Sequence, residues 1–162
     1  MLIPRHTPRV SFKGPDSPRE SGEIRSGNPG TSPNKRPLIL VVEDEPIVRR
    51  TVARMLEADG FNVVEVEHGL AARDLLTQPT FHPDLVLTDL RMPFLNGAEL
   101  GDVVNKLRPG VPVLYMSGFG SETKGWLSPE VLTSCYIAKP FSRDQLLDTV
   151  RRCLRQGVSR PN

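Results

Sequence analysis

Short apolar runs alternate with segments of helical periodicity along most of this chain. The five runs fall at residues 38–42, 62–66, 84–89, 111–117 and 135–139. Short, continuous runs of this kind, rich in β-branched residues, are typical of strands in a parallel sheet that is covered on both faces. The run at 62–66 is more polar than the first, so we expect its strand at an edge of the sheet.

Apolar residues at helical spacing follow each of the five predicted strands. These segments begin near residues 46, 70, 96, 121 and 142. Asn96 with Glu99 and Ser142 with Gln145 have the spacing of capping pairs, whereas a Gly and a Pro interrupt the segment 121–132. Five strands that alternate with five helices predict an α/β fold, a doubly wound parallel sheet with helices on both faces.

The first 36 residues differ in composition from the rest of the chain. They contain six Pro, four Gly and five Ser, and seven Lys/Arg against three Asp/Glu. Such a segment cannot bury enough apolar surface to offset the entropy lost on ordering it. We therefore predict a disordered, basic tail over 1–36, a single domain over 37–157 and a short C-terminal tail over 158–162.

Composition also narrows the compartment in which the protein works. Cys135 and Cys153 form no CxxC pair, which argues against a disulfide framework and favours a reducing cytoplasm. No apolar run approaches the roughly 18 residues that a membrane span requires. The first residues lack the apolar region of a secretory signal. We expect a soluble, cytoplasmic protein with no membrane partner, and its net charge of +2 points to no particular partner.

Polar residues stand at the ends of four predicted strands. Glu43 and Asp44 follow the first strand, Asp89 ends the third, Ser117 the fourth and Lys139 the fifth. In open parallel sheets these ends meet at one rim, where ligands bind. Three crowded carboxylates would repel by about 4 kcal/mol per pair at 4 Å. A hard cation such as Mg²⁺, together with the lysine, would offset that repulsion. The set matches a carboxylate that attacks phosphorus while the cations stabilise charge.

Four segments resemble, in order and spacing, the receiver domain of bacterial response regulators. They are LILVVEDEP, LVLTDLRMP, VLYMSG and YIAKPF, and the resemblance covers 37–157. It implies a flavodoxin-like (βα)5 fold with strand order 2-1-3-4-5, working in a two-component phosphorelay. The stretch YMSGF is also similar to receivers of hybrid sensor histidine kinases. The sequence leaves open whether the chain is a free-standing relay protein or a relative of such a module.

The resemblance implies a role for each residue of the acidic rim. Asp89 is expected to accept a phosphoryl group from the phosphohistidine of a sensor histidine kinase or a histidine phosphotransfer protein. Glu43, Asp44, Asp89 and the backbone carbonyl of Arg91 are expected to hold one Mg²⁺ or Mn²⁺. Lys139 is expected to pair with a carboxylate at rest and with a phosphoryl oxygen after transfer. The domain would catalyse only its own phosphoryl uptake and loss, so we do not expect an enzyme.

Ser117 and Tyr136 match the switch residues of the family. Phosphorylation would draw Ser117 inward and Tyr136 after it, which would remodel the face made by helix four, strand five and helix five. That face is expected to bind a downstream protein target, and no DNA-binding domain is expected. A cis peptide bond is expected before Pro140, where it would aim Lys139 inward.

Other functions are less well supported by the residues. A dehalogenase-like phosphatase needs a second acid two residues after its aspartate nucleophile, where Arg91 stands. A serine hydrolase needs a glycine two residues before and two residues after its serine, and Tyr115 and Phe119 stand at these positions around Ser117. A protein-interaction module that works without phosphorylation remains an alternative, although the full set of site residues argues against it. We also expect Phe119 to hinder water and slow hydrolysis, and Trp126 to pack against the sheet.

Overall fold

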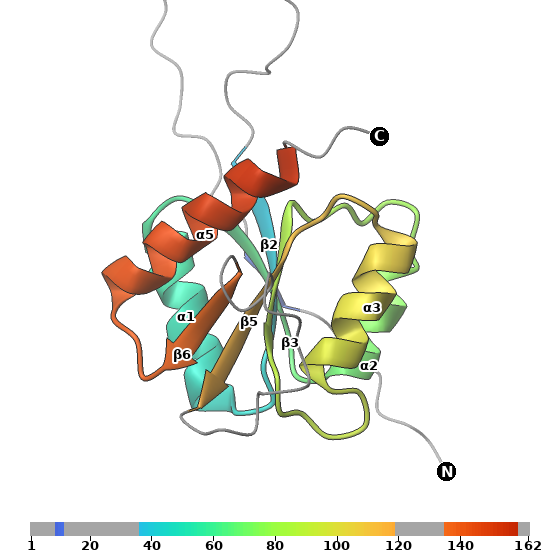
Figure 1. Cartoon of the computed structure of the whole chain (residues 1–162), viewed down its shortest axis with the longest axis horizontal. Coiled ribbons are helices and arrows are strands. Elements are labelled where there is room, and N and C mark those ends of the chain that lie inside the picture. Colours follow the sequence, from blue (N-terminus) through green and yellow to red (C-terminus); the bar gives the residue numbers. More distant parts are fainter. Residues whose placement is uncertain (1–8, 12–35, 119–134, 159–162) are drawn as a thin grey trace, which may run out of the picture.

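The five predicted strands run parallel in one sheet (Figure 1). The computed structural model describes residues 9–11, 36–118 and 135–158. The parallel strands are β2 (Leu38–Val42), β3 (Asn62–Val66), β4 (Leu85–Asp89), β5 (Val113–Gly118) and β6 (Tyr136–Lys139). Their order in the sheet is β3-β2-β4-β5-β6, with all neighbours parallel. This confirms the predicted flavodoxin-like order 2-1-3-4-5.

Helices cover both faces of this sheet. They are α1 (Pro46–Ala58), α2 (Gly69–Leu76), α3 (Gly97–Leu107) and α5 (Arg143–Val158). In Figure 1, α1 and α5 lie on one side of the strands, and α2 and α3 lie on the other. The helix predicted over 121–132 lies outside the described residues, as do Phe119 and Trp126.

The helix starts follow local chemistry. Both predicted capping pairs form. Asn96 and Glu99 exchange two bonds of 2.9 Å, each side chain accepting from the other's backbone N–H. Ser142 and Gln145 do the same, at 2.8 and 3.2 Å. The start of α2 differs, because Nδ1 of His68 accepts the N–H of Ala71 at 3.0 Å. Each such bond satisfies a backbone donor that helix geometry leaves free.

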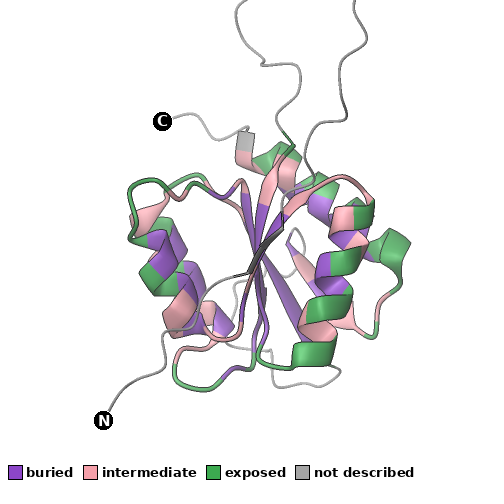
Figure 2. Ribbon diagram, turned by 180° about the vertical axis from the view of Figure 1, so that it is seen from behind, coloured by how far each residue is buried: buried purple, intermediate pink, exposed green. Residues whose placement is uncertain are grey.

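Two apolar cores form because successive side chains of a strand point to opposite faces. On β2, Ile39 and Val41 join the cluster under α1 and α5, whereas Leu40 and Val42 join the cluster under α2 and α3. Figure 2 shows the buried strands between helices whose outer faces are exposed. Burying one such side chain stabilises the fold by about 1.5–3 kcal/mol. The side chains at the ends of the strands are therefore attached to a well-packed, rigid sheet.

A sixth strand departs from the predicted organisation. β1 (Arg9–Ser11) pairs antiparallel with β3, with its central Val10 opposite Val64. The prediction that all of 1–36 is disordered is wrong for these three residues. The outer edge of β3 offers backbone N–H and C=O groups that any extended segment can pair with, whatever its composition. The antiparallel strand is therefore the outermost strand on this side of the sheet.

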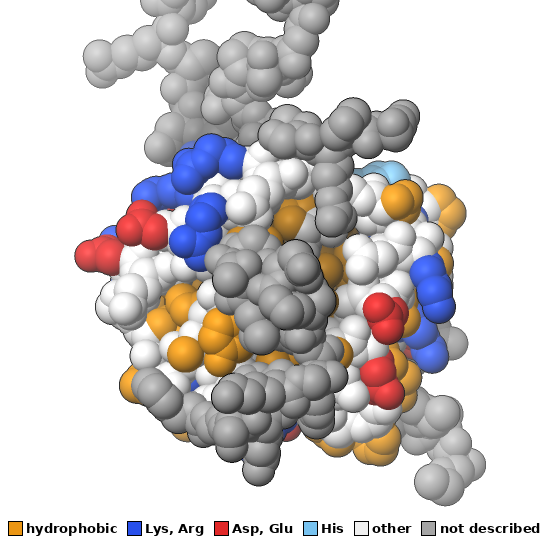
Figure 3. All heavy atoms as spheres, in the orientation of Figure 1, with side chains coloured by type: hydrophobic (Ala, Val, Ile, Leu, Met, Phe, Trp, Pro, Cys, Tyr) orange, Lys and Arg blue, Asp and Glu red, His pale blue; other side chains and the backbone are white. Residues whose placement is uncertain are grey.

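The outer face of α5 is polar and carries both signs of charge, as Figure 3 shows at the upper left. Arg151 on this face donates to Asp59, at the end of α1, over 2.6 Å, which ties the two helices together. None of the helices in the described part of the chain combines the length and the apolar character that a membrane span requires.

Candidate functional site

The carboxyl ends of the parallel strands bring the predicted site residues to one rim. Glu43 and Asp44 directly follow β2, and Asp89 is the last residue of β4. The register places Asp89 opposite Met116 and Ser117 opposite Ala138, one residue before Lys139. The rim is therefore fixed by backbone pairing of buried strands, and residues 43, 89 and 139 meet although the chain separates them widely.

Lys139 bridges two of the acids. Its Nζ lies 2.6 Å from Oε2 of Glu43 and 2.8 Å from Oδ1 of Asp89. Glu43 is 2% exposed and Asp89 is 5% exposed, so both carboxylates are recessed below the surface. Ion pairs at such distances in partly buried sites are stronger than those in water. The lysine therefore supplies positive charge where two buried acids would otherwise repel each other.

Asp44 completes an acidic cluster with these two residues. One carboxylate oxygen from each of Glu43, Asp44 and Asp89 lies within 4.8 Å of the others, and Asp44 is the exposed member. Three hard oxygen donors open to solvent on one side fit Mg²⁺, which binds through one or two carboxylates and keeps several waters. The donor set thus suits a hard divalent cation at the predicted residues.

Burial and hydrogen bonding shift the pKa values of Glu43 and Lys139. Burial raises the pKa of Glu43, and the hydrogen bond from Lys139 only partly opposes that effect. Burial alone would lower the pKa of Lys139, but its hydrogen bonds to Asp89 and Glu43 outweigh burial and raise that pKa. The lysine therefore stays charged while it bridges the acids.

The backbone around Asp89 fixes its second oxygen. The amide of Arg91 donates to Oδ2 of Asp89 at 2.8 Å, whereas the Arg91 side chain is exposed. Gly97, at the start of α3, packs so close that an added Cβ would clash with the carbonyl oxygen of Asp89. With one oxygen on Lys139 and the other on a backbone amide, the carboxylate has a single defined orientation. The Arg91 carbonyl, expected as a metal ligand, remains a prediction.

The two predicted switch residues lie on neighbouring strands, Ser117 at the rim near the end of β5 and Tyr136 at the start of β6. Ser117 is buried, and its hydroxyl donates to the carbonyl of Gly118 at 3.2 Å. Tyr136 is half-buried and packs against the core under α2 and α3. The Lys139–Pro140 peptide bond is cis, as predicted. The positions of Ser117 and of the cis bond agree with the predicted rim, whereas the roles of Ser117 and Tyr136 in switching remain predictions.

One residue of this region was not predicted. Nη1 of Arg49, in α1, donates to the carbonyl of Glu43 at 2.6 Å and reaches that of Asp44 at 3.4 Å. It therefore holds the loop that carries the two acids. An arginine about one turn into a helix is common on protein surfaces, so the spacing of Arg49 in the sequence did not point to the site.

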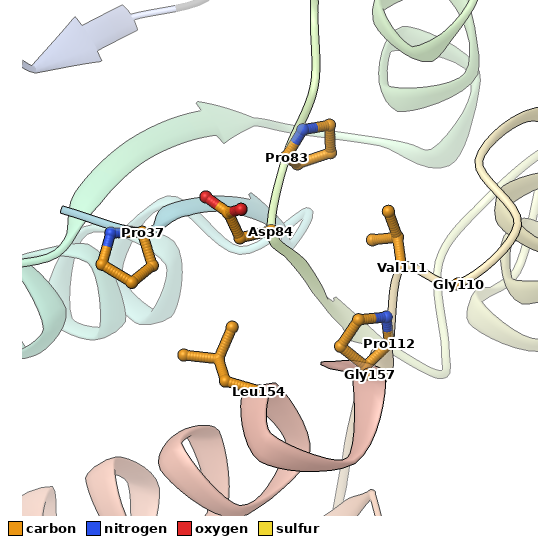
Figure 4. A pocket seen from close by; sticks show the side chains of 8 residues that line it. All are labelled: Pro37, Pro83, Asp84, Gly110, Val111, Pro112, Leu154 and Gly157. Atoms are coloured by element: carbon orange, nitrogen blue, oxygen red, sulfur yellow. The ribbon is translucent and has the colours of Figure 1, made fainter. Parts of the chain in front are cut away.

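An apolar pocket lies at the opposite end of the strands from the acidic cluster (Figure 4). That pocket has a volume of about 340 Å³, and Pro37, Pro83, Pro112 and Leu154 are among the residues that line it. Its one carboxylate, Asp84, already accepts the amide of Leu38 at 2.7 Å. Asp84 thus holds the start of β2, and this pocket is separate from the acidic rim.

Comparison with known protein families and curated proteins agrees with the geometry of the rim. The family model described as "Response regulator receiver domain" matches residues 39–151. Alkaline phosphatase synthesis transcriptional regulatory protein SphR of Synechococcus elongatus is 33% identical over 82% of this chain and 54% of its own length. Sporulation initiation phosphotransferase F of Bacillus subtilis is 28% identical over 72% of this chain and 92% of its own. The chain spans about half the length of SphR and of two further transcriptional regulators that it matches.

Solved structures give the same result. The crystal structure of a response regulator receiver protein from Sinorhizobium medicae superposes with a TM-score of 0.67 at 28% identity. The match covers 76% of this chain and 98% of that protein. The similarity thus covers about three quarters of this chain and nearly all of that receiver protein.

Proposed function

Because the chain belongs to the response regulator receiver domain family, we propose that it takes up a phosphoryl group on Asp89 from a phosphohistidine. The donor would be a sensor histidine kinase or a histidine phosphotransfer protein. One observation carries the proposal, namely that Lys139 and the Arg91 amide each hold one oxygen of the recessed Asp89 carboxylate beside two further acids. A merely structural aspartate would not need a neighbouring pair of acids.

The geometry supports a direct transfer to the carboxylate. An oxygen of Asp89 would form a bond to phosphorus as the bond from phosphorus to the histidine nitrogen breaks, and the imidazole leaves with the electron pair. Lys139 would move its charge from the carboxylate to a phosphoryl oxygen. Mg²⁺ or Mn²⁺ held by Glu43, Asp44, Asp89 and the Arg91 carbonyl would supply charge that offsets the incoming oxygens. Receiver domains are signalling domains, so the product is the phosphorylated domain itself rather than a released compound.

Ser117 and Tyr136 would couple the phosphorylation of Asp89 to a conformational change. The Ser117 hydroxyl now donates to a neighbouring backbone carbonyl, and it could turn to a phosphoryl oxygen instead. Tyr136 lies half-buried on β6, and its side chain would follow Ser117 inward. The altered surface would include β6 and α5, where we expect a downstream protein target to bind in the cytoplasm.

Incubation of the full chain with acetyl phosphate and Mg²⁺, followed by intact mass spectrometry, tests the proposal. We expect an adduct of one phosphoryl group on the wild type and none on Asp89→Asn. Asp74→Asn, which alters an exposed aspartate of α2, is the matched control and should be labelled normally. A wild type that stays unlabelled would favour a protein-interaction module that works without phosphorylation.

A further inference from the structure

Phe94 combines two features that are unfavourable in a folded protein. It lies in the loop between β4 and α3, shortly after Asp89, with a φ of 70°. This left-handed backbone conformation suits Gly or Asn, and a bulky side chain there is an outlier. The side chain is also 83% exposed, so its apolar surface stays in water. Folding alone therefore does not favour phenylalanine at this position.

The contacts of the ring do not explain its presence. It meets the ring of His68 edge-on, with centroids 6.5 Å apart and planes inclined at 77°. Phe94 belongs to neither of the two buried cores, and the contact with His68 leaves most of the side chain in solvent. A role at the surface accounts for an aromatic residue here better than packing does.

A second exposed apolar side chain stands on the same rim. Ile47, in the first turn of α1 and soon after Asp44, is 75% exposed. Across residues 36–118 and 135–157, Ile47 and Phe94 are the large hydrophobic side chains that stay exposed. The start of α1 and the loop before α3 both lie at the lower end of the sheet in Figure 1, where the strands carry the acidic cluster.

We infer that Phe94, with Ile47, is an apolar docking contact for the protein that carries the phosphohistidine, and that it contributes to the choice of donor. The inference rests on the proposed function. Asp89 is 5% exposed, so phosphorus reaches it only when the donor histidine enters the acidic pocket. A histidine on a folded partner brings the surrounding partner surface onto the rim, where exposed apolar anchors become buried. A small donor needs no such contact.

A small phosphoryl donor and a protein donor together distinguish an effect on docking from an effect on the transfer reaction. The full chain and the variants Phe94→Asn and Phe94→Leu receive either acetyl phosphate with Mg²⁺ or a panel of autophosphorylated histidine-kinase catalytic fragments. Rates are compared for the fragment that transfers fastest to the wild type. Asn tolerates the left-handed backbone but is polar, whereas Leu keeps an apolar side chain. We expect Phe94→Asn to slow transfer from the kinase fragment by about tenfold or more. Phe94→Leu should retain most of that rate, and acetyl phosphate should label all three chains equally.

The same experiment defines what overturns the inference. Equal transfer from the kinase fragment to the wild type and to Phe94→Asn would do so, as would transfer from no fragment to a chain that acetyl phosphate labels. A lower urea midpoint for Phe94→Asn would also count against it, because the ring would then have a structural role. A wild type that acetyl phosphate fails to label would defeat the proposed function itself, and the docking inference with it.

Discussion

The ammonium nitrogen of Lys139 lies 2.8 Å from Oδ1 of Asp89, across 50 residues of chain. Replacing Lys139 with Gln would leave Asp89 and Glu43 recessed without that charge, and we expect the free energy of unfolding to fall by about 2 kcal/mol. Added Mg²⁺ should restore part of this loss, because an ion bound to the native acids stabilises the folded state. Urea unfolding with and without Mg²⁺ measures both effects. The exposed Lys106→Gln serves as control, and equal midpoints for the two variants would contradict the prediction.

A substitution at Asp44 tests the metal site without altering Asp89, the proposed nucleophile. It is the exposed member of the cluster, so Asp44→Asn removes repulsion without leaving a buried charge unpaired. We expect this variant to be more stable than the wild type in the absence of divalent cations. In rising Mg²⁺ the wild type should gain stability and the variant little, because a ligand is missing. Thermal unfolding over a Mg²⁺ series, with Asp74→Asn as control, would reveal an unaltered response if the ion binds elsewhere.

Local chemistry allowed much of the fold to be predicted. The run of apolar residues in β2 predicted a parallel strand covered on both faces, and the strand is buried between two parallel neighbours. The Asn96–Glu99 pair needs only two side chains at fixed spacing, so it could be identified without tertiary information. The acidic rim followed from topology, because parallel strands present their carboxyl ends together.

Other features depend on contacts that no local pattern contains. β1 is a three-residue strand whose pairing partner is an edge more than 50 residues away along the chain. The His68 cap uses a ring nitrogen in place of the usual oxygen of Ser, Thr, Asp or Asn. The left-handed backbone at Phe94 goes against the preference of its own side chain, so propensity points the wrong way. Conflicts of this kind are expected at functional surfaces.

Gly97 lets α3 approach the phosphoacceptor strand. In Gly97→Ala the new Cβ would meet the carbonyl of Asp89, which is backbone and cannot rotate away. We expect the free energy of unfolding to fall by about 1–3 kcal/mol, with slower labelling by acetyl phosphate because the carboxylate shifts. Gly118→Ala is the matched control, since nothing lies within 4 Å of its added Cβ. Stability and labelling equal to the control would show that α3 can move away without cost.

Tyr115 should make stability fall at alkaline pH. It is buried on β5, and Gly101 of α3 leaves room for its hydroxyl. Burial, followed by the nearby charges of Asp102 and Cys135, raises the pKa of Tyr115 to about 12. An unfolded tyrosine loses its proton near pH 10. Between these values the folded chain binds more protons than the unfolded chain, so the free energy of unfolding falls as pH rises. From pH 9 to pH 11 this residue should contribute a loss of about 1 kcal/mol.

Tyr115→Phe has no proton to lose, so its urea midpoint should fall less than that of the wild type over this range. Parallel curves for the two chains would mean that the hydroxyl ionises as readily in the folded protein as in water.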